Sequence, residues 1–237
     1  MNEIPKIIHQ IWSGIDEPLP EQFKELGDTW KENHPDWEYM YWDEACINEF
    51  IQEFYPQHWT IYKGFKYNVQ RWDAIRYLIL DKIGGLYVDF DYESLSPMDD
   101  ILRDKSCCFS AEPKEHLKIF SKEVYFNNAL MASVPNHPFI KIIIEAVFRK
   151  ADNEIIFQNK MMEVLETTGP LLLTSLYEQF SNKGSIYIIP DELVSPLSKN
   201  EALKIILNDK LEKETEEYLE KKLEKAIALH YFLGSWL

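Results

Sequence analysis

Cysteine and positive charge are both scarce in this sequence of 237 residues. Only Cys46, Cys107 and Cys108 are present. Three cysteines without a CxxC pair provide neither a disulfide framework nor a zinc site. Lys and Arg number 25 against 40 Asp and Glu, so the formal net charge is −15. Nucleic-acid binding needs Lys and Arg to displace counterions, so this composition argues against a nucleic-acid partner.

Long apolar runs are lacking as well. The start, residues 1–6, has no basic region followed by an apolar stretch, which argues against a signal peptide. No run approaches the roughly 18 apolar residues of a membrane span. We therefore expect a cytoplasmic protein with reduced thiols. Hydrophobic residues make up 46% of the chain, which excludes global disorder, and the length fits a single domain over residues 1–237.

Strand and helix patterns alternate along the chain, which predicts an α/β fold. The expected strands cover residues 6–12, 37–42, 86–89, 107–111, 129–132 and 185–189. The expected helices cover residues 21–32, 43–54, 66–83, 137–150, 158–166 and 171–180. The Lys- and Glu-rich segment 209–225 predicts a solvated helix, with its inward face formed by Leu211, Tyr218, Leu219 and Leu223.

The most informative stretch is GGLYVDFD, residues 84–91. A glycine pair ends a long helical pattern, and two carboxylates follow a short apolar strand. Residues i and i+2 of a strand point to one side, so we expect Asp89 and Asp91 to converge. Two hard oxygen donors suit Mg²⁺ or Mn²⁺, which often carries a phosphate. The alternatives are a structural turn and a phosphatase of the haloacid dehalogenase type, which also places a DxD after a strand.

Other chemistry-bearing residues flank this stretch. Asp73 and Arg76 share one face of the preceding helix, and they form either a surface ion pair or a buried pair that needs partners such as ligand hydroxyls. Trp12 ends an apolar strand and serves either the core or a nucleotide base. His230 lies in an aromatic segment that we expect to pack on the body, where an imidazole is an acceptable Mn²⁺ ligand.

Several motifs, taken together and in order, resemble the glycosyltransferases with a DXD sugar-binding region. That group contains yeast mannosyltransferases, bacterial capsular polysaccharide and lipopolysaccharide transferases and, more distantly, the clostridial glucosylating toxins. The resemblance extends over residues 4–236. It is carried by IPKIIHQIW (4–12), HPDW (34–37), DxxR (73–76), GGLYVDFD (84–91), TGP (168–170) and GSW (234–236).

The resemblance implies a GT-A fold, with a Rossmann-like mixed central sheet flanked by helices and additional C-terminal helices. It also implies a nucleotide-sugar donor and a divalent metal. The implied roles at the donor are base stacking for Trp12, donor-sugar binding for Asp73 and Arg76, a place near the sugar for Asn127 or Asn128, donor binding for Ser235 and closure over the diphosphate for Trp236. The implied roles at the metal are ribose and metal contacts for Asp89, direct metal ligation for Asp91 and late metal ligation for His230.

We therefore expect a retaining glycosyltransferase that uses Mn²⁺ or Mg²⁺. It would transfer a hexose from a UDP-linked donor to a glycan or lipid-linked acceptor in bacterial surface polysaccharide synthesis. A lipid-linked acceptor would bring the cytoplasmic enzyme to the inner face of a membrane. No carboxylate is identifiable as a nucleophile, so same-face attack is favoured over a covalent intermediate. The competing functions are a toxin-like effector that glycosylates a host protein, a non-catalytic nucleotide-sugar binder and the DxD phosphatase.

Overall fold

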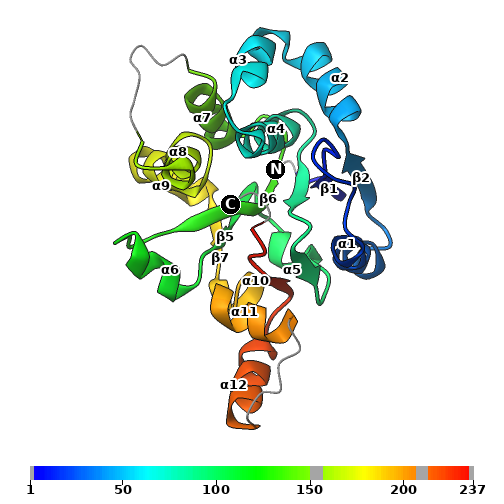
Figure 1. Ribbon diagram of the computed structural model, residues 1–237, viewed down its shortest axis with the longest axis vertical. Coiled ribbons are helices and arrows are strands. Elements are labelled where there is room, and N and C mark those ends of the chain that lie inside the picture. Colours follow the sequence, from blue (N-terminus) through cyan, green and yellow to red (C-terminus); the bar gives the residue numbers. More distant parts are fainter. Residues whose placement is uncertain (1–2, 150–156, 207–212, 235–237) are drawn as a thin grey trace.

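A mixed six-stranded sheet forms the centre of the molecule, as a computed structural model shows (Figure 1). The structure describes residues 3–149, 157–206 and 213–234. In spatial order the strands are β2 (Glu38–Trp42), β1 (Ile7–Ile11), β3 (Gly85–Val88), β6 (Phe126–Ser133), β5 (Cys107–Ala111) and β7 (Tyr187–Ile189). Strand β6 is antiparallel to its neighbours β3 and β5, and the other pairs are parallel.

Helices cover both faces of this sheet. Successive strand residues point to opposite faces, and on both faces they pack into a buried apolar cluster. Leu86 and Tyr87, for example, are neighbours in β3 but belong to two separate buried clusters. One face packs against α2 (Glu44–Phe54), α3 (Trp59–Gly64), α4 (Asn68–Lys82), α7 (Pro138–Val147) and α9 (Pro170–Gln179). The other face packs against α1 (Glu21–Asn33), α5 (Asp99–Leu102) and α10 (Asp191–Val194). The expected α/β architecture is confirmed.

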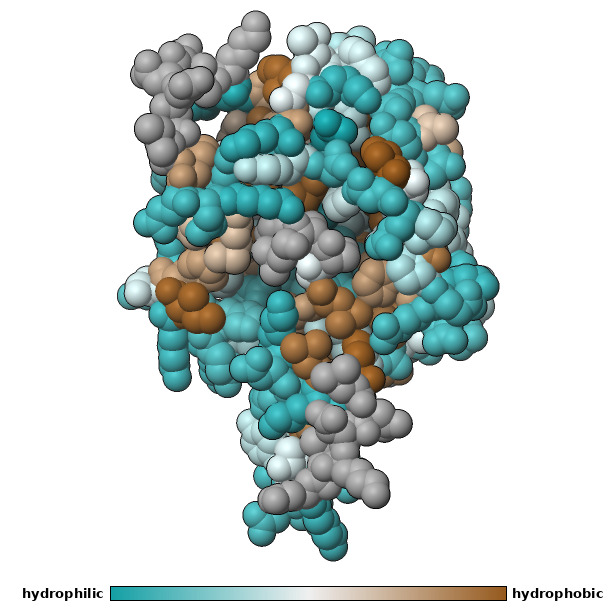
Figure 2. All heavy atoms as spheres, viewed as in Figure 1, coloured by the Kyte–Doolittle hydropathy of each residue, from teal (hydrophilic) through white to brown (hydrophobic). Residues whose placement is uncertain are grey.

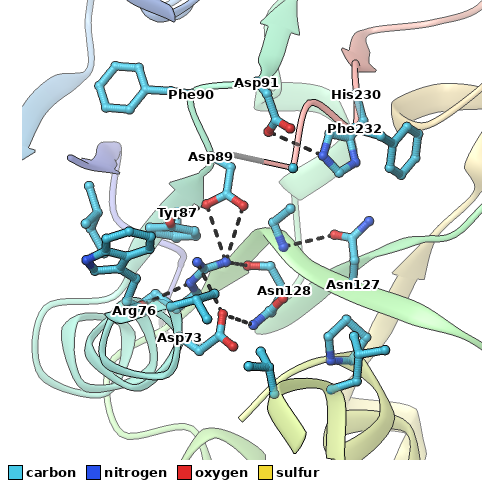
Figure 3. A pocket seen from close by; sticks show the side chains of 18 of the residues that line it. Asp73, Arg76, Tyr87, Asp89, Phe90, Asp91, Asn127, Asn128, His230 and Phe232 are labelled. Carbon is cyan, nitrogen blue, oxygen red and sulfur yellow. Dashed lines mark hydrogen bonds and ion pairs between the residues drawn. The ribbon is translucent and has the colours of Figure 1, made fainter. Parts of the chain in front are cut away.

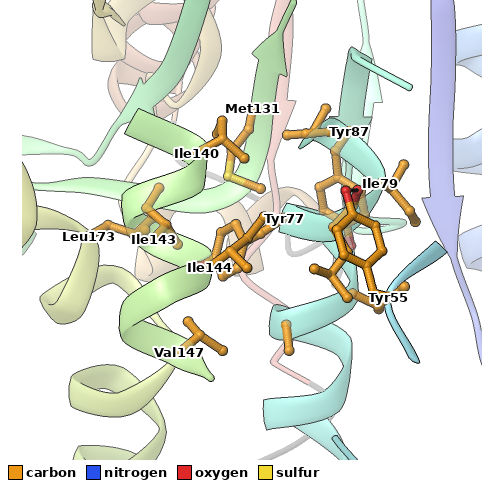
Figure 4. Close-up of a cluster of buried hydrophobic side chains, with 14 of the residues drawn as sticks. Tyr55, Tyr77, Ile79, Tyr87, Met131, Ile140, Ile143, Ile144, Val147 and Leu173 are labelled. Atoms are coloured by element: carbon orange, nitrogen blue, oxygen red, sulfur yellow. Dashed lines mark hydrogen bonds between the residues drawn. The ribbon is translucent and has the colours of Figure 1, made fainter. Parts of the chain in front are cut away.

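The larger core lies between the sheet and helices α4, α7 and α9 (Figure 4). Ile140, Ile143 and Ile144 of α7 face α4 and the sheet, and all three are buried. Each fully buried aliphatic side chain contributes about 1.5–3 kcal/mol relative to exposure. This packing makes α4 a rigid support for the polar residues that it carries.

The glycine pair predicted to end a helix connects α4 to β3. Gly84 and Gly85 have φ angles of 74° and 100°, which L side chains rarely adopt. A Cβ on Gly85 would lie 2.6 Å from the carbonyl oxygen of Ile7 on β1. The ring of His9 bonds the carbonyl of Gly84 through Nε2 at 2.8 Å, and burial lowers the pKa of His9 to about 4. A neutral imidazole thus anchors the connection.

A two-stranded antiparallel sheet, absent from the predicted elements, joins distant parts of the chain. Strand β4 (Tyr92–Ser94) pairs with β8 (Ala228–His230), and Tyr92 lies opposite His230. The described end of the chain therefore packs onto the body beside the DXD stretch, as its aromatic residues predicted. Three-residue strands carry too short a pattern for sequence periodicity to reveal them.

The remaining helices lie at the periphery: α6 (Lys114–Ile119), α8 (Lys160–Thr167), α11 (Lys199–Ile206) and α12 (Lys213–Leu223). Hydrophilic side chains cover α12 at the lower end of Figure 2, which confirms a solvated helix. Leu219 faces inward as predicted, but the prediction for Tyr218 was wrong, since that side chain is 52% exposed. A phenol tolerates exposure because its hydroxyl is hydrated. Leu211 lies outside the described residues.

The other predicted elements differ from the observed ones mainly at their ends. Asp43 caps α2 as expected, since its carboxylate accepts the N–H of Cys46 at 2.8 Å. The expected strand 107–111 matches β5, whereas β6 extends beyond the expected 129–132. Within the described residues, no helix is both long and apolar enough to cross a membrane.

Candidate functional site

The DXD residues lie in a tight turn and not in a strand. Strand β3 ends at Val88, and the N–H of Tyr92 donates to the carbonyl of Asp89 at 3.2 Å. The expectation that strand pleating aligns Asp89 with Asp91 was therefore wrong. The turn that connects Val88 at the end of β3 to Tyr92 at the start of β4 sets their positions instead. Both carboxylates nevertheless line one cavity.

Asp89 is the more exposed of the two carboxylates, with 30% of its side chain accessible. Its Oδ1 lies 3.3 Å from Nη1 of Arg76 and accepts a hydrogen bond from the hydroxyl of Tyr87. The guanidinium of Arg76 lies over the Tyr87 ring, 4.6 Å from its centroid. Burial raises the pKa of Asp89 against the opposing effect of Arg76. Tyr87 and Arg76 thus fix the direction of a partly exposed carboxylate.

Asp73 lies deeper, on α4, with both carboxylate oxygens engaged. Oδ1 accepts the side-chain N–H of Asn128 and Oδ2 accepts the hydroxyl of Thr168, each at 2.8 Å. Nη2 of Arg76 lies 3.3 Å from Oδ1. Burial raises the pKa of Asp73 to about 6 although these partners favour the charged form. The carboxylate is therefore rigidly held, and its charged form lowers the stability of the folded state because it is buried.

Arg76 joins the two carboxylates. Besides Asp73 and Asp89, it donates from Nη1 to the carbonyl of Asn128 at 2.7 Å and from Nε to the carbonyl of Trp72 at 3.2 Å. The side chain is buried, so the surface ion-pair alternative is excluded. A buried charge network of this kind contributes little to the free energy of folding, because the cost of burying the charges offsets their attraction. An arrangement of this kind is expected where orientation matters more than stability.

Asp91 is held from the opposite side by the chain end. Its Oδ1 lies 3.3 Å from Nε2 of His230, and its Oδ2 accepts the N–H of Leu233 at 3.0 Å. Burial disfavours the charged form of Asp91, but His230 and the Leu233 N–H outweigh it, so its pKa is lowered. Burial likewise opposes charge on His230, and Asp91 outweighs it, so the pKa of His230 is raised. Asp91 and Nε2 of His230 thus face each other in the cavity.

His230 lies between two aromatic rings. It stacks on Tyr92 with ring centroids 4.2 Å apart, and the ring of Phe232 lies 3.9 Å away. Phe232 has a φ of 53°, an uncommon value for a bulky residue. This backbone conformation leads directly to Leu233, whose N–H reaches Asp91. Strain of this kind is concentrated at functional sites.

Trp12 lies where β1 ends, at the other side of the cavity. Its Nε1 donates to the carbonyl of Glu17 at 2.9 Å, and its ring meets Phe23 and Phe90 edge-on at 5.4 and 6.3 Å. The indole is half-buried and lines the cavity. The part of the indole that lines the cavity offers an aromatic surface to a planar ligand.

The cavity has a volume of about 390 Å³. Figure 3 shows the Asp73–Arg76–Asp89 network next to the Asp91–His230 pair. The cavity runs across the end of the sheet at which β1, β3 and β5 finish and the antiparallel β6 begins. Trp12 follows β1, Asp89 follows β3, Asn127 and Asn128 lie near the start of β6, and Glu112 follows β5. These groups combine an aromatic surface, paired carboxylates and hydrogen-bonding amides, which suits a polar ligand with an aromatic end.

Most of the predicted site residues meet in this cavity: Trp12, Asp73, Arg76, Asp89, Asp91, Asn127, Asn128 and His230. Between the two asparagines, Asn128 holds Asp73, whereas Asn127 uses its side-chain oxygen for the N–H groups of Ala129 and Leu130. Ser235 and Trp236 lie outside the described residues.

Sequence reasoning missed Tyr87, the hydroxyl of Thr168, and Phe232. Tyr87 stands two residues before Asp89, so the strand alternation could have revealed it. Thr168 and Asp73 are 95 residues apart in the sequence, and the residues around Thr168 give no sign of their hydrogen bond. Its neighbour Gly169 does precede a helix with Pro at its first position, as predicted.

Residues 20–108 match the family model of the glycosyltransferase sugar-binding region containing the DXD motif. The matched stretch includes four of the predicted site residues that line the cavity: Asp73, Arg76, Asp89 and Asp91. The chain carries the sugar-binding region of the DXD-containing glycosyltransferases. The predicted resemblance to this family is confirmed.

Curated relatives support the same assignment. Inositol phosphoceramide mannosyltransferase 2 of Schizosaccharomyces pombe is 31% identical over 180 residues, which are 76% of this chain and 48% of that protein. Mannosyl phosphorylinositol ceramide synthase SUR1 of Saccharomyces cerevisiae is 33% identical over 182 residues, which are 75% of this chain and 42% of that protein. The chain thus spans about half the length of these relatives or less.

The solved structure of the PaToxG glycosyltransferase has a similar fold. It superimposes with a TM-score of 0.58 at 17% sequence identity, covering 94% of this chain and 86% of that one. At this identity the likeness concerns the fold alone. Together with the mixed sheet and its helical layers, it confirms the expected GT-A fold.

The DXD motif of this family implies a divalent metal, and the donor set fits one. Among the described residues, no three His, Cys, Asp or Glu side chains gather into a metal cluster. Asp89 and Asp91 nevertheless present carboxylate oxygens to the same cavity. Each ionised carboxylate has about four acceptor positions, so its present partners leave room for a cation. Hard oxygen ligands suit Mg²⁺ or Mn²⁺.

Proposed function

We propose that this chain is a metal-dependent, retaining hexosyltransferase that uses a nucleoside-diphosphate sugar. The observation that carries the proposal is the meeting of the DXD carboxylates with the Asp73–Arg76 pair in one cavity of a GT-A fold. The family match over residues 20–108 supports it, because these four residues all lie in the matched region.

The order of groups along the sheet edge suggests how a donor would lie. Its base would stack on Trp12 at the end of β1, and its diphosphate would lie at the turn after β3. Its sugar would then reach Asp73, Arg76 and Asn128. The carboxylate of Asp73 is held by Asn128 and Thr168, so sugar hydroxyls would meet a preformed partner. Preformed geometry lowers the entropic cost of aligning the anomeric carbon.

Asp89 and Asp91 would hold Mn²⁺ or Mg²⁺, with His230 as a third ligand. When bound, the metal supplies charge neutralisation for the departing diphosphate. Arg76 and Tyr87 keep the Asp89 carboxylate in place, and the N–H of Leu233 does so for Asp91. We keep Ser235 as a donor-binding residue and Trp236 as the residue that closes over the diphosphate, as the family resemblance implies.

We propose same-face attack for the chemical step. The acceptor hydroxyl oxygen forms the new bond to the anomeric carbon while the bond from that carbon to the diphosphate oxygen breaks. The proton of the hydroxyl passes to the departing phosphate oxygen. The Asp73 carboxylate is bound to Asn128, Thr168 and Arg76, an arrangement that favours an orienting role over that of a covalent nucleophile.

For the donor we propose a UDP-linked hexose and for the acceptor a glycan or lipid-linked glycan. Both relatives quoted above are named for adding mannose to an inositol phosphoceramide, so GDP-mannose is the donor to compare. Those names also favour a lipid-linked acceptor and, with it, contact with a membrane surface. Bacterial surface polysaccharide synthesis in the cytoplasm stays a prediction from the resemblance.

A nucleotide-sugar panel tests the proposal. UDP-glucose, UDP-galactose and GDP-mannose are incubated with the protein and Mn²⁺, and release of free nucleotide is measured. We expect one donor to turn over, and Asp91→Ala to retain less than about a tenth of that rate. Asp81→Asn is the matched control, because this buried Asp of α4 bonds Tyr55 outside the cavity. Phosphomonoester hydrolysis without donor turnover would favour the phosphatase instead.

A further inference from the structure

Two ionisable side chains of the cavity have no role in donor binding as proposed above. Glu112 follows β5, and His116 lies on α6. The carboxylate of Glu112 is buried, with 8% of the side chain exposed, and 17% of the His116 side chain is exposed. Oε2 of Glu112 lies 2.5 Å from Nδ1 of His116. A buried carboxylate of this kind needs a partner, and the imidazole supplies only part of what it can accept.

The pair is firmly positioned. The N–H of Glu112 donates to the carbonyl of Tyr125 at 3.0 Å, which fixes the backbone of Glu112 against the chain leading into β6. The ring of His116 meets Phe232 edge-on at 5.0 Å, and Phe232 in turn lies against His230. Glu112 and His116 are therefore coupled by packing to the residues around Asp91.

The place of the pair in the sheet indicates which substrate it serves. Trp12 and Asp89 directly follow β1 and β3, and Asn128 lies in β6, whereas Glu112 directly follows β5, the next strand outward. Neighbouring strands lie about 4.8 Å apart, so Glu112 is roughly 14 Å along the edge from Trp12. A donor whose base lies at the end of β1, whose diphosphate lies at the turn after β3 and whose sugar lies near Asn128 of β6 leaves the β5 end of the cavity free for the second substrate.

The chemistry of this end suits a polyhydroxylated ring. A carboxylate accepts hydroxyl groups strongly, and an imidazole both donates and accepts. The rings of Phe120 and Tyr125, with centroids 5.0 Å apart, line the same cavity and offer apolar surface to the C–H face of a sugar or inositol ring. The combination of a paired acid and imidazole with aromatic surface matches a cyclic polyol better than an extended peptide.

We propose that Glu112 and His116 bind the acceptor, and that the acceptor is a cyclic polyol head group whose hydroxyls they hold. This inference rests on the proposed function, since it assigns the second substrate of the same site. The alternative is a purely structural pair that ties α6 to β5. A structural pair would affect folding and all kinetic constants together, whereas an acceptor-binding pair acts selectively on the KM of the acceptor.

Kinetics with two small acceptors test this proposal. Methyl α-D-mannopyranoside and myo-inositol are offered with the active donor to the wild type, Glu112→Gln and His116→Gln. We expect the acceptor KM to rise about 10- to 100-fold for the preferred probe, since each variant loses hydrogen bonds to a charged or ionisable group. The Kd of the free nucleotide with Mn²⁺ should stay within about twofold of wild type. The probe with the lower KM distinguishes a sugar from an inositol acceptor.

Glu115→Gln is the matched control, because Glu115 is an exposed glutamate on the same helix and does not line the cavity. Variants of Glu112 with the kinetics of Glu115→Gln would overturn the acceptor assignment and leave the proposed function standing. A wild type that binds no nucleotide and turns over no donor would overturn the proposed function and the acceptor assignment with it. His116→Gln, at a more exposed position, preserves the test if Glu112→Gln fails to fold.

Discussion

Replacing Asp73 with asparagine should stabilise the protein at neutral pH while abolishing its activity. In the folded state, burial raises the pKa of Asp73 to about 6 from an ordinary value of 3.8. The unfolded chain therefore releases this proton at lower pH than the folded one. Linkage requires the folded state to lose stability as pH rises from about 4 to about 6. Above that range the free energy of unfolding is lower by about 3 kcal/mol, because the pKa differs by about two units between the two states and each unit corresponds to about 1.36 kcal/mol.

The asparagine side chain imitates the neutral form of Asp73 and does not titrate. Asp73→Asn should therefore match wild type in stability below about pH 4 and exceed it by up to about 3 kcal/mol above about pH 6. Urea denaturation across this pH range measures the difference. Donor turnover should fall by orders of magnitude, because Arg76 loses its charged partner and, under the proposed function, the sugar hydroxyls lose theirs.

Two outcomes would refute this reasoning. A variant less stable than wild type at neutral pH would mean that Arg76, Asn128 and Thr168 more than compensate for burial of the charge. A stability difference that does not depend on pH would mean that Asp73 does not titrate in this range. The control Asp81→Asn should keep its activity, because Asp81 lies outside the cavity.

Three other substitutions probe single contacts. Tyr87→Phe removes the hydroxyl that orients Asp89, so donor kcat/KM should fall about tenfold with little change in stability; an unchanged kcat/KM would exclude this role. Gly85→Ala places a Cβ 2.6 Å from the carbonyl oxygen of Ile7 at a φ of 100°. We expect the free energy of unfolding to fall by more than about 2 kcal/mol, and an unchanged midpoint of urea denaturation would contradict this. Trp12→Ala should weaken nucleotide binding about tenfold by calorimetry, and equal affinity would remove the indole from the base site.

The fold was largely predictable where apolar patterns are long. Strand 107–111 is bounded by polar residues and matches β5, and helix 66–83 corresponds to α4 with a difference of one or two residues at each end. Strands β4 and β8 were not predictable, because each has three residues and their pairing joins Tyr92 to His230 across most of the chain. Local sequence carries no signal for such a contact.

The site was predictable in its residue types but not in its geometry. The spacing of Asp89 and Asp91 indicated a shared ligand, yet a turn sets their positions. Thr168 belongs to a helix-start pattern, and only the fold brings its hydroxyl to Asp73. Glu112 stands in an ordinary Ala-Glu-Pro loop, and its burial in the cavity follows from the antiparallel pairing of β5 with β6.

Calorimetric titration with UDP and GDP, with and without Mn²⁺, tests the central claim most directly. The account predicts that one nucleotide binds the wild type with an affinity that drops at least about tenfold on metal removal, and by as much in Asp91→Asn. An affinity that neither the chelator nor the substitution changes would contradict it, because the carboxylates of the DXD turn would then take no part in holding the diphosphate.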